Sequence, residues 1–79
     1  MNQKDDTSIE KRVYDIIRKA ILQRKLTPGM KISALFLSKE IGVSRTPVRL
    51  ALQQLSAEGL VVMNANKAAH VAKPSVRNV

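Results

Sequence analysis

Residues 42–61 read GVSRTPVRLALQQLSAEGLV, a stretch that joins a polar, basic start to a regular apolar stripe. The apolar side chains recur at steps of three and four residues: Val48, Ala51, Leu52 and Leu55. In a helix they fall within an arc of about 100°, which is typical of a face that packs against a core. Ser44 suits an N-cap, and Pro47 is tolerated in a first turn. The stretch therefore predicts a helix over residues 45–58, ending before Gly59.

The other side of this predicted helix carries side chains suited to nucleic acid. At about 100° per residue, its polar groups lie together on the flank and back of the helix, away from the stripe: Arg45, Thr46, Arg49 and Gln53. An arginine fork matches guanine O6 and N7, or a phosphate, in a bidentate manner. The hydroxyl groups of Ser44 and Thr46 are natural phosphate ligands. The alternative is that the arginines only keep an amphipathic helix soluble.

Leu50 falls on the same polar side of the predicted helix, so packing in the core does not account for it. We expect it to be exposed beside the base-reading face, where it could touch a thymine methyl group. A structure in which Leu50 is buried would show that this face is wrongly assigned.

Residues 34–41 (ALFLSKEI) predict a second helix, capped by Ser33 at its start and by Gly42 in a left-handed conformation at its end. Residues 30–33 (MKIS) form a brief expected strand before it, with Met30 and Ile32 alternating. Only residues 42–44 separate this helix from the next one.

Thr7 and Glu10 have the spacing of a capping box, so a first helix is expected to begin near Ser8. Its apolar face recurs at helical spacing: Ile9, Val13, Ile16, Ile17, Ala20 and Ile21. The helix should stop around Lys25 or Leu26, because residues 27–29 (TPG) are typical of a turn.

Residues 60–63 (LVVM) and 68–72 (AAHVA) predict two strands joined by a turn. A tight helix pair followed by a hairpin predicts a mainly α fold with a small β-hairpin, a winged helix-turn-helix of three helices plus a wing. We expect this domain to span residues 8–72, between a flexible tail (1–7) and a C-terminal tail or linker stub (73–79).

The wing, residues 64–70, is expected to reach a minor groove or the DNA backbone through Lys67 at its tip. His70 in the returning strand could contact phosphate. The alternatives are an ordinary polar turn and a surface histidine.

Composition limits the possible functions of this 79-residue chain. The net charge is +8 and four of the six acidic residues lie at the start, at Asp5, Asp6, Glu10 and Asp15, which favours a polyanionic partner. With no cysteine and one histidine, neither a metal site nor a cofactor is expected. No nucleophile and base stand at a recognisable spacing, so an enzyme is not expected. We also expect no membrane partner, because apolar runs are short, and a cytoplasmic location.

LSKEIGVSRTPVRLALQQLSAEGLV (37–61) resembles the helix-turn-helix of GntR-type bacterial transcription regulators, whose usual form is close to LAxxLGVSRTPVREALxxLxxEGLV. Residues 13–32 also resemble the family's first helix and turn, and NKAAHVA (66–72) resembles its wing, NRGAFVA. The resemblance implies an N-terminal winged-helix domain that binds a palindromic operator in double-stranded DNA. It implies a homodimer if a C-terminal effector domain is present, and an isolated domain that is monomeric or weakly dimeric. The positions that match the family's DNA contacts are Ser44, Arg45, Thr46, Arg49 and, in the wing, Lys67.

Four positions depart from the family's usual form. Ala34 and Leu35 replace a glutamate and an arginine that often touches DNA, Leu50 replaces a glutamate, and Ala68 replaces a wing glycine. If exposed Leu35, Phe36 and Leu50 formed one apolar patch, the scaffold could instead be a protein-interaction module. Binding of structured RNA through charge alone is a third possibility.

Overall fold

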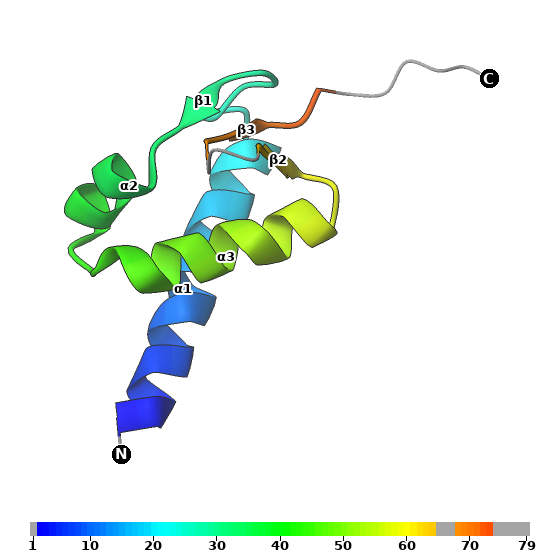
Figure 1. Cartoon of the computed structure of the whole chain (residues 1–79). Coiled ribbons are helices and arrows are strands. Elements are labelled where there is room, and N and C mark those ends of the chain that lie inside the picture. The colour runs from blue at the N-terminus through cyan, green and yellow to red at the C-terminus, as the bar shows by residue number, and fades with distance from the viewer. Residues whose placement is uncertain (1, 65–67, 74–79) are drawn as a thin grey trace.

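The computed structural model of the protein describes residues 2–64 and 68–73, with side chains from residue 8 onward. The helices and strands of this part are, in chain order, α1 (Asn2–Leu22), β1 (Lys31–Ile32), α2 (Ala34–Ile41), α3 (Arg45–Ala57), β2 (Val61–Met63) and β3 (Ala69–Val71). The chain is mainly helical and ends in a small antiparallel sheet (Figure 1). The predicted fold class, a winged helix-turn-helix, is therefore confirmed.

The start of α1 differs from the prediction. The helix begins at Asn2 rather than near Ser8, so the capping-box interpretation of Thr7 and Glu10 is wrong. Residues 2–7 contain neither glycine nor proline to break a helix, and acidic residues are favourable near a helix N-terminus. The helical backbone thus includes residues that we expected to belong to a tail. The domain boundaries at 8–72 and 73–79 stay predictions.

The end of α1 also comes earlier than expected, at Leu22 instead of Lys25 or Leu26. Arg24 adopts a left-handed conformation with φ 62°. The backbone N–H of Lys25 then donates to the carbonyl oxygen of Ala20 at 2.8 Å. This hydrogen bond ends the helix. The left-handed residue at such an end is more often a glycine, so the residue types in this segment do not show that the helix ends here.

Both caps of α2 are as predicted. The Ser33 hydroxyl accepts a hydrogen bond from the Phe36 backbone N–H at 3.1 Å. Gly42 has φ 84°, and its N–H donates to the Ser38 carbonyl oxygen at 2.9 Å. A residue with a Cβ would be strained in this conformation, so Gly42 fixes the sharp turn between α2 and α3.

The sheet contains one more pairing than the predicted hairpin. Its strand order is β1-β3-β2, and both pairs are antiparallel. Ala69 and Val71 of β3 are buried, whereas His70 between them is only half-buried. Across the ladders, His70 pairs with Lys31 of β1 and with Val62 of β2. The sheet thus has a buried apolar inner face, and its outer face carries Lys31, His70 and the exposed Val62.

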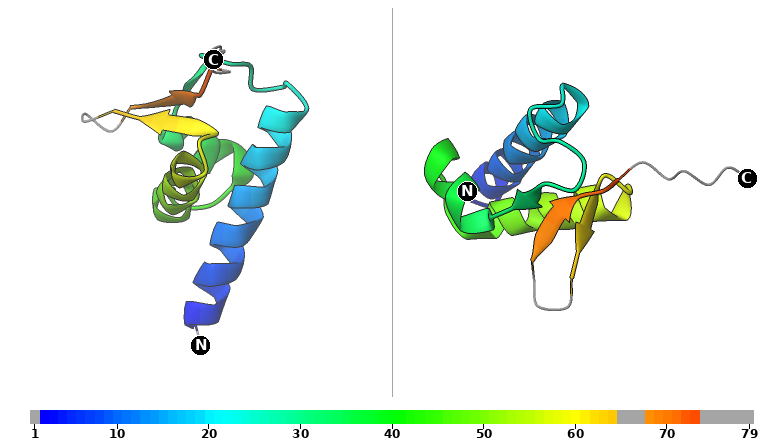
Figure 2. Two further views of the ribbon diagram at one scale, coloured as in Figure 1. Left: turned by 90° about the vertical axis from the view of Figure 1, so that its right-hand side faces the viewer. Right: turned by 90° about the horizontal axis from the view of Figure 1, so that it is seen from above.

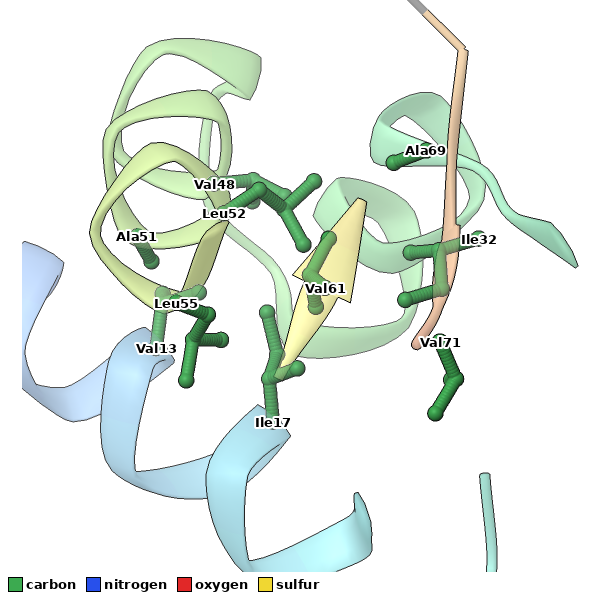
Figure 3. Packing of buried hydrophobic residues seen from close by; sticks show 10 residues of the cluster. All are labelled: Val13, Ile17, Ile32, Val48, Ala51, Leu52, Leu55, Val61, Ala69 and Val71. Carbon is green, nitrogen blue, oxygen red and sulfur yellow. The ribbon is translucent and has the colours of Figure 1, made fainter. Parts of the chain in front are cut away.

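The core draws on α1, α3 and all three strands (Figure 3). Its buried side chains are Val13, Ile17, Ile32, Val48, Ala51, Leu52, Leu55, Val61, Ala69 and Val71. The predicted α3 stripe is therefore confirmed in full. The α1 stripe was predicted too wide, because Ile16 is 41% exposed, Ala20 is only half-buried, and the half-buried Ile9 and Ile21 pack at the edge of the core.

The hairpin and α1 both pack against the buried face of α3 (Figure 2). In the left view of Figure 2 the hairpin lies over α3 and points away from α1, and the view from above shows the same direction. The hairpin therefore projects from the domain on the side away from α1.

Tyr14 ties α1 to the end of α3. Its hydroxyl donates to Glu58 Oε1 at 2.6 Å. This hydrogen bond, desolvation and the Glu58 charge together raise the pKa of Tyr14 above its ordinary value of 10.0. Loss of the phenol proton breaks the bond and places two negative charges side by side.

We expect Tyr14 to titrate above its ordinary pKa in the folded protein, and Glu58→Gln to lower that pKa. The chain has one tyrosine and no tryptophan, so near-ultraviolet absorbance follows Tyr14 alone. Because the folded-state pKa is raised, the stabilisation is fully present below the unfolded-state pKa and is lost as pH rises through the folded-state pKa. An identical titration curve for wild type and Glu58→Gln would contradict this contact.

Candidate nucleic-acid interface

A hollow of about 280 Å³ lies where the start of α2, the exposed flank of α3 and the sheet meet. We call it the arginine hollow. Its polar rim comes from α3, at Arg45, Arg49 and Gln53, and its apolar lining includes Leu35 and Met63. The three polar side chains lie one turn apart along the same flank of the helix. The structure thus brings these three predicted residues together.

The two arginines of the hollow are free to bind a ligand. Arg45, Arg49 and Gln53 are all exposed. Within residues 8–64 and 68–73, the only ion pair joins Lys11 Nζ to Asp15 Oδ2, at 3.7 Å on α1, so neither guanidinium group has a carboxylate partner there. Their donor forks therefore remain available for a planar acceptor such as a guanine edge or a phosphate.

Ser44 and Thr46 lie around a different hollow, of about 480 Å³, on the other side of the α3 start. We call it the threonine hollow. Glu10, Pro47, Leu50 and Ile9 also line it. The predicted single group of Arg45, Thr46, Arg49 and Gln53 is therefore divided between two neighbouring hollows. The helical wheel placed these four side chains on one arc, but it cannot show which neighbours from α1 and α2 separate them.

The start of α3 leaves its hydrogen-bonding groups unused. Ser44 occupies the N-cap position, but its side chain makes no capping hydrogen bond, and the first turn holds no acidic residue. At the start of α2, by contrast, the Ser33 hydroxyl accepts a hydrogen bond from the Phe36 backbone N–H. The backbone N–H groups of Arg45 and Thr46 and the Ser44 hydroxyl can thus donate to an anion such as a phosphate group, although the Glu10 carboxylate lines the same hollow.

Leu50 is 42% exposed, so the expectation that core packing does not account for it is confirmed. Its neighbours differ from those we expected. It shares the threonine hollow with Thr46 and Pro47 and does not line the arginine hollow.

His70 lies apart from the α3 arginines, on the outer face of the sheet. It lines a third hollow, of about 460 Å³, together with Lys31, Asn64 and Lys73. Sequence reasoning missed Lys31 and Lys73, because their position beside His70 depends on the pairing of β1 with β3. Lys67 at the predicted wing tip lies outside the described residues, and its role stays a prediction.

Within residues 8–64 and 68–73, no three His, Asp or Glu side chains are grouped so that they could hold a metal ion. Among the helices described, none has the length and apolar character needed to cross a membrane.

Residues 9–71 match the sequence model of the family described as bacterial regulatory proteins, gntR family. The chain belongs to this family. The resemblance in residues 37–61 is thereby confirmed, and DNA binding by a transcription regulator is the function that this membership supports. No comparison supports a protein-interaction module.

Named relatives from several bacteria agree with this assignment. The HTH-type transcriptional repressor RspR of Escherichia coli strain K12 is 31% identical over 71 residues, which is 90% of this chain and 31% of the relative. A helix-turn-helix regulator encoded in an unstable DNA locus of Streptomyces ambofaciens is 39% identical over 61 residues, or 77% of this chain and 26% of the relative. The chain therefore spans about a third or less of the length of these two relatives.

Two solved structures show the same fold. One belongs to Lar, described as controlling expression of the Listeria monocytogenes agr system; it superposes with a TM-score of 0.74 at 33% identity, over 81% of this chain and 30% of that one. The other is YtrA from Sulfolobus acidocaldarius, a GntR-family transcription factor, with a TM-score of 0.67 at 30% identity, over 87% of this chain and 59% of that one.

Proposed function

We propose that this gntR-family domain reads duplex DNA with α3 in the major groove and the arginine hollow facing the base edges. The observation that carries the proposal is the cluster of exposed Arg45, Arg49 and Gln53 without carboxylate partners in the described structure. Around α3, Arg49 lies about 60° and Arg45 about 20° from the buried Leu52. Both arginines are exposed, so they lie on the flank of α3 beside the core, where a groove can approach them.

Phosphate contacts at the start of α3 would fix the position of the helix in the groove. The Ser44 hydroxyl and the first amides of α3 have no side-chain partner at the cap, and Thr46 lies exposed beside them. The positive end of the helix dipole favours an anion at this place. Such contacts set orientation and register, while the arginine hollow reads the bases.

The sheet supplies a second basic surface in this proposal. His70 lies on its outer face with Lys31 and Lys73, and the wing, residues 64–70, would bring Lys67 to a minor groove or to the backbone. These contacts add affinity with little sequence preference, because phosphates carry no base identity.

The wider setting is also part of the proposal. If this chain is one domain of a full-length regulator, we propose that the regulator is a homodimer. Such a homodimer would bind a palindromic operator. We further propose a cytoplasmic protein with no catalytic role, since the relatives are named as transcription regulators.

Fluorescence anisotropy with labelled duplex DNA tests the proposal. Neutralising about four phosphates should lower the affinity about 100-fold between roughly 50 and 200 mM salt, because each contact releases counterions. Duplex RNA should compete poorly, since its deep and narrow major groove does not admit α3. No binding at low salt, or binding that is insensitive to salt, would contradict the proposed function.

The alternative of a protein-interaction surface finds less support in the geometry. Leu35, Phe36 and Leu50 are all exposed, but Leu35 lines the arginine hollow and Leu50 lines the threonine hollow. Leu35 and Leu50 therefore line separate hollows, which weakens the case for a single apolar patch.

A further inference from the structure

Leu35 is an apolar side chain in an otherwise cationic binding surface. It is 46% exposed and lines the arginine hollow opposite Arg45, Arg49 and Gln53. On α2 the half-buried Leu37 and Ile41 pack against the core, so the domain does not need Leu35 to complete that packing. Its exposure next to Arg45, Arg49 and Gln53 leaves it available to an apolar group within the groove.

The backbone holds Leu35 firmly in this place. Its carbonyl oxygen accepts a hydrogen bond from the buried Ser38 hydroxyl at 2.8 Å. The neighbouring Phe36 N–H is bound by the Ser33 cap at 3.1 Å, and Ser33 directly follows β1. Because these contacts fix the backbone of the first turn of α2, Leu35 would meet DNA with little loss of backbone freedom.

The major groove offers one prominent apolar group at the base edges, the C5-methyl group of thymine. The other groups in the same groove are hydrogen-bond donors and acceptors, which suit Arg45, Arg49 and Gln53. We propose that Leu35 is a specificity-determining residue that packs on a thymine methyl group beside the base pairs read by the α3 arginines. This inference rests on the proposed function.

The same geometry disfavours Leu50 for this contact. Leu50 has a similar exposure, 42%, but it lies in the threonine hollow among Ile9, Val43 and Pro47. That hollow is occupied by the phosphate-binding start of α3 in our proposal, and it holds no arginine. The thymine contact that the sequence suggested for Leu50 is thus better assigned to Leu35.

The test starts from duplexes that the wild-type chain selects from a random pool. These selected duplexes should share a fixed thymine in each half-site. Replacing that thymine with uracil removes only the methyl group. We expect wild type to bind the uracil duplex about three- to fivefold more weakly, the effect of burying one methyl group. Leu35→Ala should bind both duplexes equally, and so should Leu35→Gln, which keeps the length of the side chain without its apolar end.

Leu50→Ala is the matched control and should keep the wild-type ratio between the thymine and uracil duplexes. The uracil substitution also alters base stacking, but only the direct contact depends on the side chain at residue 35. Selected sites without a fixed thymine, or a ratio unchanged in both Leu35 variants, would overturn the assignment while leaving DNA binding intact. If wild type bound no duplex at low salt, the proposed function itself would fail.

Discussion

Arg49→Ala is expected to remove most of the domain's preference for its selected DNA sequence over random duplex. Arg49 is exposed, has no carboxylate partner in the described structure and lines the arginine hollow between Arg45 and Gln53. A bidentate contact to guanine discriminates by about 1 to 3 kcal/mol, so the specificity ratio should fall by roughly 5- to 150-fold. Parallel titrations of selected and random duplexes measure this ratio directly.

Arg18→Ala is the matched control for this experiment. It removes the same charge from an exposed position on α1, and Arg18 does not line the arginine hollow or the threonine hollow. It should weaken binding to both duplexes slightly and equally. If Arg49→Ala behaved in the same way, Arg49 would be a phosphate contact and base reading would have to come from other residues.

Leu55→Ala is expected to have the largest effect on stability. Leu55 is fully buried in the core that α1, α3 and the sheet share. Truncating a buried leucine costs about 2 to 5 kcal/mol, which is a large part of the total stability of a domain of this size. We expect the melting temperature, measured by circular dichroism, to fall by at least about 10 °C.

Leu50→Ala makes the same chemical change on the same helix and serves as its control. Because Leu50 is 42% exposed, less apolar area is lost and the cost should be about 1 kcal/mol or less. Equal losses of stability in the two variants would show that α3 is rotated about its axis relative to the structure described above.

Features that depend on local residue patterns could be predicted from the sequence. The caps at Ser33 and Gly42 follow from residue type and short spacing, since each acts within one helical turn. The buried face of α3 follows from its 3.6-residue period. Exposure of Leu50 follows from the same period.

Features that depend on contacts between distant segments could not be predicted from the sequence. The pairing of β1 with β3, which places Lys31 opposite His70, joins residues far apart in the chain. The division between Arg49 and Thr46 depends on α1 and α2 filling the space beside α3. The end of α1 depends on a left-handed arginine at residue 24, a conformation for which no common sequence signal exists.

The role of Leu35 shows how the two kinds of information combine. The sequence identified it as a departure at a position that often touches DNA in similar proteins. Only the structure shows that it faces the same hollow as Arg45 and Arg49. In our proposal, a leucine at this position stays in the reading surface and gives it an apolar group in place of a charged one.

An NMR titration of the labelled chain with its selected duplex tests the central claim most directly, because backbone amide shifts map the bound surface. The account predicts that the largest shifts occur at Ser44, Arg45 and Arg49 and at Leu35, with small shifts at Arg18. Largest shifts on α1, with those at Arg45 and Arg49 unchanged, would contradict the claim that α3 and the arginine hollow read DNA.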